Sequence, residues 1–271
     1  MNDFKQTIKA VMPEIAWAAL KRARVRWTNS RFQSYQVNHT YYGFPLDVTI
    51  TNPLSQSWYD HDWPRMPELD QLSAHKLRPG ARVFDLGAHQ CVVALMLSRI
   101  VGPTGHVLAV EACREDAEAG RRNQELNGAD NLEILHAAVA AQTGPITFTL
   151  DAHVDTPSQK SAKVTVDGYS IDDLASRYGA PDVLFIDVEG YECQALKGAE
   201  RTLRQKPDCF VEVHVGVGLE NFGASVEDVL GFFPREEFDW YGCLPDGLQF
   251  APLTSESTCL RQHFYLIAIA R

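Results

Sequence analysis

The chain has 271 residues, of which 45% are hydrophobic and 22% are charged, and its formal net charge at pH 7 is −10. This length and composition favour one large α/β domain with an N-terminal extension over two complete domains. The negative charge argues against a nucleic acid as the main partner, because neutralising phosphates requires a basic surface. No run of 18 or more apolar residues occurs, so we expect no transmembrane segment.

The charge is distributed unevenly along the chain. Residues 1–31 carry a balance of +5, and their pattern predicts a helix over 1–27, interrupted near Pro13. Such a basic arm can contact an anionic membrane surface, or it can pack on the acidic body or on a second subunit, and we favour packing. The arm lacks a signal-peptide core, and the six cysteines are widely spaced without a C-x-x-C motif. We therefore expect a cytoplasmic protein with reduced thiols. Packing of the arm on a second subunit would give a homo-oligomer.

Residues 32–63 are rich in aromatic residues and turn formers and include a short predicted strand at 48–50. A helix is predicted over 66–76. We expect residues 1–77 to form an extension that covers the edge of a sheet built by residues 78–271. The aromatic side chains then either wall an acceptor pocket or form the core of the extension, and for any one ring the core is the favoured interpretation.

The most informative stretch is 82–91, where an apolar strand ends at Asp85 and turns through Gly87 into a predicted helix over 92–100. The next predicted strand, 106–110, is followed by Glu111. Open α/β sheets bind ligands at the edge where these acids lie. A dinucleotide would need a glycine-rich turn and would be repelled by Asp85. Asp85 and Glu111 together favour a ligand that has a cationic group and a ribose, as S-adenosylmethionine has.

Strand and helix patterns alternate through the rest of the chain. Gly128 is expected to end the helix over 114–127, and Ser170 and Ser225 are expected to begin two further helices. The remaining predicted elements are strands at 131–135, 183–187, 210–215, 238–241 and 263–270, a hairpin-like pair at 146–150 and 163–166 around a polar loop, and helices at 193–204 and 225–233.

Four blocks of sequence resemble the FkbM-type family of class I S-adenosylmethionine-dependent methyltransferases. They are Phe-Asp-Leu-Gly-Ala-His at 84–89, Arg-Asn-Gln-Glu-Leu-Asn-Gly at 122–128, Leu-Phe-Ile-Asp-Val-Glu-Gly-Tyr-Glu at 184–192 and Leu-Lys-Gly-Ala-Glu at 196–200, followed by Glu-Val-His at 212–214. The resemblance implies a Rossmann-like fold whose seven-stranded sheet is mostly parallel with an antiparallel last strand. It also implies methyl transfer to a hydroxyl, often on a sugar or secondary metabolite.

The resemblance also assigns the cofactor site. Residues Asp85, Gly87, Ala88 and His89 would line the methionine part, with Asp187 nearby. Glu111 and Ala112 would bind the ribose, and His136 and Ala137 would lie near the adenine. The family usually has glycine where this chain has Cys91. We expect weakened rather than abolished binding, on the premise that position 91 begins a helix and needs no positive φ.

An alcohol oxygen needs a base or a metal before it can attack the methyl group. Asp187 and Glu189 follow one central strand, and Glu212 and His214 end the next, so each pair shares a side if the chain stays extended. Either His214 is the base, oriented by Glu189 or Glu212 while Asp187 positions the acceptor, or the cluster holds Mg²⁺. We favour the metal-free base. Glu192 and Glu200 are interpreted as surface or capping residues.

The sequence thus predicts an S-adenosylmethionine-dependent O-methyltransferase that acts on a small hydroxylated acceptor, such as a sugar, a glycolipid precursor or a secondary metabolite. Two alternatives remain open at this point. One is an NAD-dependent oxidoreductase, against which the single-glycine turn and Asp85 count. The other is a catalytically silent binding module, suggested by Cys91.

Overall fold

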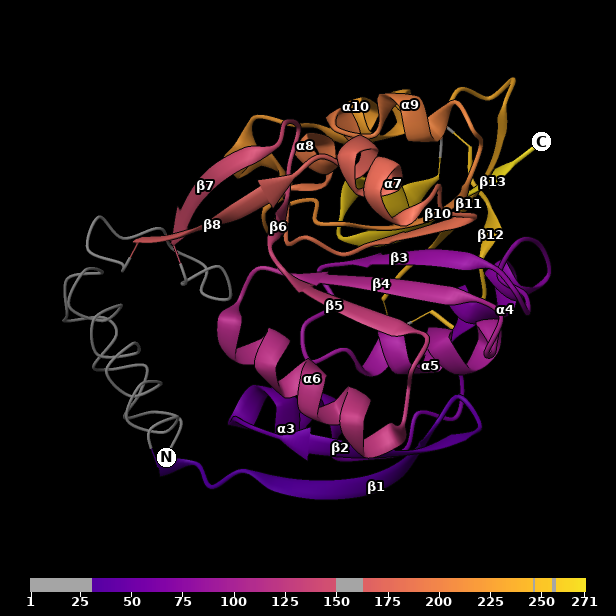
Figure 1. Ribbon diagram of the computed structural model, residues 1–271. Helices are drawn as coiled ribbons and strands as arrows, with labels where there is room; N and C mark the ends of the chain where they lie inside the picture. The colour runs from indigo at the N-terminus through magenta and orange to yellow at the C-terminus, as the bar shows by residue number, and fades with distance from the viewer. Residues whose placement is uncertain (1–30, 150–162, 246, 255–256) are drawn as a thin grey trace, which may run out of the picture.

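The computed structural model describes residues 31–149, 163–245, 247–254 and 257–271. The basic arm predicted over 1–27 and the polar loop predicted over 151–162 lie outside these residues. The described chain forms one large sheet with helices on both faces, and an N-terminal hairpin lies outside the helices on one side (Figure 1). None of its helices is long and apolar enough to cross a membrane.

Eight strands of the described chain form the large sheet, in the order β12-β11-β13-β10-β9-β3-β4-β5. Their bounds are β3 (Arg82–Leu86), β4 (His106–Glu111), β5 (Leu132–His136), β9 (Val183–Ile186), β10 (Asp208–Val213), β11 (Phe238–Cys243), β12 (Ala251–Pro252) and β13 (Phe264–Ala270). β3, β4, β5, β9 and β10 pair in parallel, whereas β13 is antiparallel to both β10 and β11. The predicted seven-stranded sheet with an antiparallel last strand is confirmed, with the two-residue β12 added at one edge.

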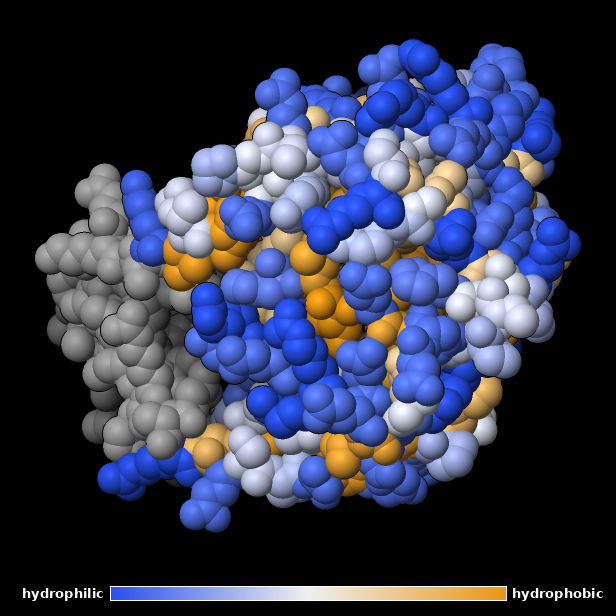
Figure 2. Space-filling model, in the orientation of Figure 1, coloured by the Kyte–Doolittle hydropathy of each residue, from blue (hydrophilic) through white to orange (hydrophobic). Residues whose placement is uncertain are grey.

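The strands at the centre of the sheet are apolar because both faces are covered. β9 is buried at every position, and two apolar cores lie on opposite faces of the sheet. The first core contains α5 (Val92–Val101) and lies towards α6 (Arg114–Asn127). The second lies under α7 (Ile171–Tyr178), α8 (Glu192–Lys197), α9 (Glu200–Leu203) and α10 (Val226–Gly231). The face shown in Figure 2 is mostly hydrophilic, with hydrophobic atoms exposed between α6 and α7, near β5.

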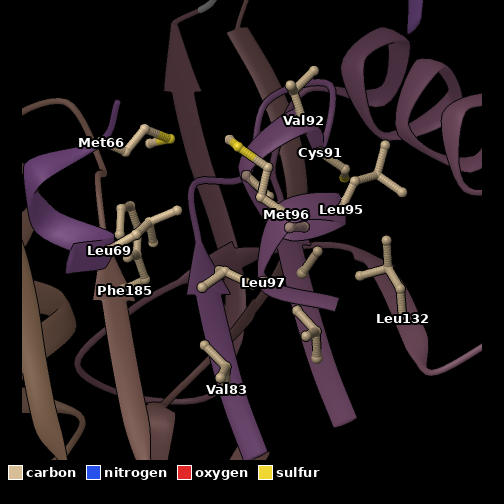
Figure 3. Packing of buried hydrophobic residues seen from close by; sticks show 14 of the residues in the cluster. Met66, Leu69, Val83, Cys91, Val92, Leu95, Met96, Leu97, Leu132 and Phe185 are labelled. Atoms are coloured by element: carbon tan, nitrogen blue, oxygen red, sulfur yellow. The ribbon is translucent and has the colours of Figure 1, made fainter. Parts of the chain in front are cut away.

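The N-terminal part of the described chain adds a further layer. The hairpin β1 (Tyr35–Tyr41) and β2 (Phe44–Ile50) packs across α5 and α6, followed by α3 (Pro53–Tyr59) and α4 (Pro67–Ser73). The strand predicted at 48–50 is thus the end of a longer hairpin strand. Met66 and Leu69 share the apolar core of α5, as Figure 3 shows, so these elements fold as one body with the sheet.

Several helix ends form as the sequence predicts. Gly128 adopts φ +55° after α6, Ser170 caps α7, and Ser225 caps α10 through a reciprocal capping box with Asp228. The hairpin-like pair becomes β7 (Gly144–Thr149) and β8 (Lys163–Tyr169), which form a separate sheet with β6 (Ala138–Val139). Two 3₁₀ turns, η1 (Leu219–Phe222) and η2 (Thr258–Arg261), lie in loops.

The prediction of a single helix over 193–204 is wrong, because the helix is interrupted at Gly198, between α8 and α9. A Cβ atom at Gly198 would lie 2.2 Å from the carbonyl oxygen of Ala140. The Gly198 carbonyl instead accepts a hydrogen bond from the backbone N–H of Asp172 at 2.8 Å. This close backbone contact replaces one turn of helix.

Candidate functional site

The turn after β3 brings two strand ends into backbone contact. Gly87 has φ +92°, and a Cβ atom there would lie 1.7 Å from the carbonyl oxygen of Asp187, so only glycine fits. The backbone N–H groups of Gly87 and Ala88 both donate to the carbonyl of Val110, at 2.9 and 3.1 Å. The ends of β3, β4 and β9 therefore meet at one edge of the sheet.

Asp85 lies beneath this turn and is only 3% exposed. Its Oδ2 is buried and has no hydrogen-bond partner among the described residues. Burial, with a smaller contribution from the charge of Glu111, raises the pKa of Asp85 to about 7. A buried carboxylate in this state gains most from a cationic group, so the site fits a ligand with an ammonium or a sulfonium.

Glu111, at the end of β4, is held by backbone amides. Its Oε2 accepts from the N–H of His89 at 2.7 Å, and its Oε1 accepts from the N–H of Cys113 at 2.6 Å. Burial raises the pKa of Glu111 to about 7 against the effect of these bonds. Each carboxylate oxygen keeps a second lone pair, so the group can also accept from ribose hydroxyls.

The candidate adenine residues lie directly beside Glu111. His136 pairs with Glu111 across β4 and β5, and its Nε2 lies 3.2 Å from the carbonyl oxygen of Ala112. The N–H of Ala137 donates to the carbonyl of Glu111 at 3.0 Å. The structure thus brings all the residues predicted for the cofactor to one edge of the sheet.

Cys91 departs from the sequence expectation, because it has φ +61° and lies in the left-handed region. The premise that this position needs no positive φ is therefore wrong. The conformation costs about 1–2 kcal/mol for a residue other than glycine. The Cys91 side chain is fully buried in the apolar cluster of Figure 3. Its sulfur fills the space beside Gly120 of α6, where an added Cβ would lie 2.5 Å away. The thiol packs on α6.

The predicted acceptor residues form a second cluster at the same edge. His214, after β10, is 5% exposed, and its Nε2 faces three carboxylates. The distances from this nitrogen are 3.5 Å to Glu189 Oε2, 3.7 Å to Asp187 Oδ1 and 3.8 Å to Glu212 Oε1. These four side chains come together although β9 ends at Ile186 and Glu189 adopts φ +53°, so the condition that residues 187–189 stay extended is not met.

Glu192 is the residue that orients His214, and its interpretation as a surface or capping residue is wrong. Its side chain is fully buried, and its Oε1 lies 2.6 Å from His214 Nδ1. The same oxygen accepts from the N–H of Gly190 at 2.8 Å. The expectation that Glu189 or Glu212 orients the imidazole is therefore also wrong, because both face its other nitrogen. The sharp turn at Gly190 directs Glu192 back under the strand ends.

His263 is a member of the cluster that the sequence analysis missed. Its Nε2 lies 2.7 Å from Glu212 Oε1, and its ring stacks on that of His214 with 4.8 Å between centroids. His263 directly precedes β13. Because β13 is antiparallel, its beginning lies at the edge where the parallel strands end, and this rule would have found the residue.

The charges in the cluster shift its pKa values in opposite directions. Burial alone would lower the pKa of His214, but the hydrogen bond to Glu192 and the nearby carboxylates outweigh it and raise the pKa. Burial, reinforced by Glu212 and Glu189, raises the pKa of Asp187. At Glu212 burial is the largest single influence and raises the pKa, but the hydrogen bond from His263 and the nearby imidazoles together outweigh it and lower the pKa. The cluster thus pairs an imidazole that gains a proton readily with carboxylates that stabilise its charge.

Comparison with known proteins decides the family. The model of the methyltransferase FkbM domain matches residues 85–239, which is more than half of the chain. The chain belongs to the FkbM methyltransferase family. The model of protein-L-isoaspartate(D-aspartate) O-methyltransferase also matches, over residues 7–141. This family consists of S-adenosylmethionine-dependent methyltransferases, so membership favours that expectation over the oxidoreductase alternative.

Solved structures show similarity at low identity. The FkbM methyltransferase of Methylobacillus flagellatus KT is 19% identical, with a TM-score of 0.45, covering 69% of this chain and 43% of that one. The chain thus spans less than half the length of that relative. A putative O-methyltransferase from Klebsiella pneumoniae is 14% identical, with a TM-score of 0.47, covering 76% and 79% of the two chains.

Proposed function

We propose that this FkbM-family methyltransferase transfers the methyl group of S-adenosylmethionine to a hydroxyl of a small acceptor such as a sugar, a glycolipid precursor or a secondary metabolite. The observation that carries the proposal is the buried Glu192–His214 pair, in which Nδ1 contacts Glu192 and Nε2 faces the carboxylates of the second cluster. The orphaned Oδ2 of Asp85 supports the placement of the cationic cofactor at the neighbouring strand end.

S-adenosylmethionine supplies an electrophilic methyl group on a positively charged sulfur. In the proposed arrangement, Asp85 and the turn through His89 orient the methionine part, Glu111 and Ala112 hold the ribose, and His136 and Ala137 flank the adenine. Asp187 lies between the two halves, since its backbone contacts Gly87 and its carboxylate lies in the acceptor cluster. The close approach of these strand ends can align the acceptor oxygen with the methyl carbon and sulfur.

His214 acts as the general base in this proposal. Its Nδ1 hydrogen is held by Glu192, so Nε2 carries the lone pair and accepts the proton of the acceptor hydroxyl. The oxygen–carbon bond forms as the carbon–sulfur bond breaks, giving a methyl ether and S-adenosylhomocysteine, and the proton passes from His214 to solvent. Glu189 and Glu212 stabilise the imidazolium, and Asp187 positions the acceptor through a hydrogen bond.

The same residues define the competing cation mechanism. Single ligand atoms of Asp187, Glu189 and His214 lie within 4.8 Å of one another, as do those of Glu212, His214 and His263. A divalent cation such as Mg²⁺ could bind there and lower the pKa of the acceptor hydroxyl. We favour the base, because the Glu192 contact and the raised pKa of His214 are the features expected of a proton acceptor.

The proposal extends to the organisation and location of the protein. We place the boundary between the extension and the catalytic domain at residues 77 and 78, with the extension acting as a cap on the cofactor edge. We also propose a cytoplasmic location and an acceptor that is a small molecule rather than a nucleic acid. The contacts of α3 with the turn after β3, given below, support the capping role.

The direct test is a screen of hydroxylated acceptors with isotopically labelled methyl donor, read by mass spectrometry. The expected product gains one methyl group on oxygen, and the His214→Ala variant makes it far more slowly. Transfer to nitrogen or carbon would contradict the O-methyl assignment, and transfer to a carboxyl oxygen would contradict the hydroxyl acceptor, while either result would leave the family intact. A protein that binds the donor but methylates no hydroxylated acceptor would favour the silent binding module.

A further inference from the structure

The turn after β3, residues 87–91, is called the cofactor turn below. It contains two residues other than glycine in the left-handed conformation, His89 with φ +47° and Cys91 with φ +61°. Such residues persist only where the surrounding structure holds them. Part of this support comes from the turn's own domain, since Asn123 of α6 donates to the carbonyl of Gln90 at 3.0 Å. A further part comes from the N-terminal extension.

Tyr59, the last residue of α3, contacts His89 directly. Its hydroxyl oxygen lies 2.8 Å from His89 Nδ1, and the two rings lie 5.6 Å apart. Burial raises the pKa of Tyr59 well above its usual value, so the hydroxyl keeps its proton, and it donates a hydrogen bond to Nδ1 in the tautomer that carries the ring hydrogen on Nε2. The Nε2 hydrogen then points towards Asp116 Oδ1, 3.5 Å away. The imidazole is thus held from both sides.

Tyr59 is itself fixed before any ligand binds. Its side chain is 5% exposed, and its carbonyl oxygen accepts a hydrogen bond from the hydroxyl of Tyr41 in β1. α3 begins with a capping box between Asn52 and Ser55, which sets the direction of the helix. Next to it, Gln90 of the cofactor turn donates to Thr51 Oγ1 at 2.5 Å. The extension therefore holds the turn at two consecutive residues.

The contact at His89 continues to the candidate ribose site. The N–H of His89 donates to Glu111 Oε2 at 2.7 Å, so the left-handed conformation of His89 sets the position of the Glu111 carboxylate. We propose that Tyr59 is a positioning residue for the cofactor, because its hydroxyl holds the His89 ring and thereby directs the His89 N–H at Glu111. This inference rests on the proposed function, since it takes the turn and Glu111 as the cofactor site.

The test compares Tyr59→Phe with Tyr35→Phe by calorimetric binding of S-adenosylhomocysteine to the full chain. Tyr35 is a matched control, because its hydroxyl donates to Asp60 Oδ2 at 2.6 Å within the same extension. Loss of one hydrogen bond of about 1 kcal/mol should weaken binding by about fivefold in Tyr59→Phe. Tyr35→Phe should bind as the wild type does. In turnover, Tyr59→Phe should raise the KM for the donor and leave kcat near the wild-type value.

A double-mutant cycle with His89→Asn separates positioning from general stability. Asparagine tolerates the left-handed region but lacks the ring that Tyr59 contacts, so Tyr59→Phe should weaken binding no further in that background. Additive losses would overturn the proposal, as would a Tyr59→Phe variant that melts earlier yet binds with wild-type affinity. If Tyr59→Phe does not fold, His89→Asn alone must weaken binding at least fivefold or the proposal fails. Wild-type protein that binds no S-adenosylhomocysteine would refute the proposed cofactor site as well.

Discussion

The Nδ1 atom of His214 lies 2.6 Å from a carboxylate oxygen of Glu192 that is completely buried. This contact fixes the orientation of the imidazole and leaves Nε2 facing Asp187, Glu189 and Glu212. Glu192 also places its charge where it stabilises an imidazolium without touching the acceptor. The first predictions follow from this relationship.

Replacing Glu192 with glutamine should lower the methyl-transfer rate by about a hundredfold or more, because the imidazole loses the carboxylate that stabilises its protonated form. The matched control is Glu200→Gln, since Glu200 is exposed and pairs with Arg204 one helical turn away. Single-turnover rates with saturating donor give the comparison. Equal rates in the two variants would remove Glu192 from the mechanism.

The His214→Ala variant should lose about two to four orders of magnitude in rate, the range typical of a general base, while its affinity for S-adenosylhomocysteine changes little. His106, at the opposite end of the parallel strands, supplies the control His106→Ala. Calorimetry and product formation are measured on the same preparations. A variant with a wild-type rate would show that another group takes the proton.

Removal of divalent cations should leave the activity nearly unchanged if His214 Nε2 is the proton acceptor. The protein is dialysed against a chelator, assayed, and assayed again after addition of Mg²⁺ and, separately, Mn²⁺. Activity that disappears on chelation and returns with the cation would instead establish the metal mechanism. In that case His263→Ala, which removes the other imidazole of the cluster, distinguishes which of the two ligand groups holds the ion.

Binding of S-adenosylmethionine near pH 7 should release protons. The pKa of Asp85 is raised to about 7, so a substantial fraction of the molecules carries a proton there at neutral pH. A cation bound beside this carboxyl favours the ionised form and lowers the pKa, so the proton is lost to the buffer. Calorimetry in two buffers of different ionisation enthalpy measures the release, which Asp85→Asn should reduce. An equal release by wild type and variant would place the cation elsewhere.

The raised pKa values also predict how stability depends on pH. Asp85 and Glu111 titrate near 7 in the folded protein but near 4 when unfolded, so the folded state binds more protons between these values. The free energy of unfolding contributed by these groups should therefore fall as pH rises from about 4 to about 7. Urea unfolding of wild type and Asp85→Asn across this range checks the sign, because the variant should show a weaker decline.

The Cys91 sulfur packs against Gly120, and the coupling between the two positions can be measured as a free energy. Gly120→Ala should destabilise the wild type by about 1–3 kcal/mol, because the new methyl group would overlap the Cys91 sulfur. In the Cys91→Gly background the same change should be tolerated, since the sulfur is gone and glycine accepts φ +61°. Urea unfolding of the four proteins gives the coupling free energy, and strictly additive effects would disprove the pairing.

Much of the fold could be predicted from the sequence, because local signals and tertiary packing agree there. Helix α6 has the predicted bounds, and Gly128 ends it because a left-handed conformation suits glycine. The carboxylates Asp85 and Glu111 could be placed at one edge, since parallel strands end together. β9 could be recognised as central because it is apolar without alternation.

The acceptor site was harder to predict from the sequence, because the positions of its side chains depend on backbone turns. Glu192 looks like a residue of a helix surface until the turn at Gly190, with φ +95°, directs it inward. His263 is 49 residues beyond His214 in the chain and joins it only through the antiparallel pairing of β13 with β10. Cys91 takes an unfavourable conformation that its neighbours impose. In all three cases long-range packing outweighs the local pattern.

The place of β13 between β10 and β11 has a consequence for the order of assembly. β11 joins the large sheet through β13, so residues 238–243 cannot dock until a segment synthesised later has paired with β10. His263 arrives with that same segment. During synthesis, the nascent chain can therefore bring the cofactor residues of β3 and β4 together early. The cluster around His214 is complete only after β13 has inserted between β10 and β11.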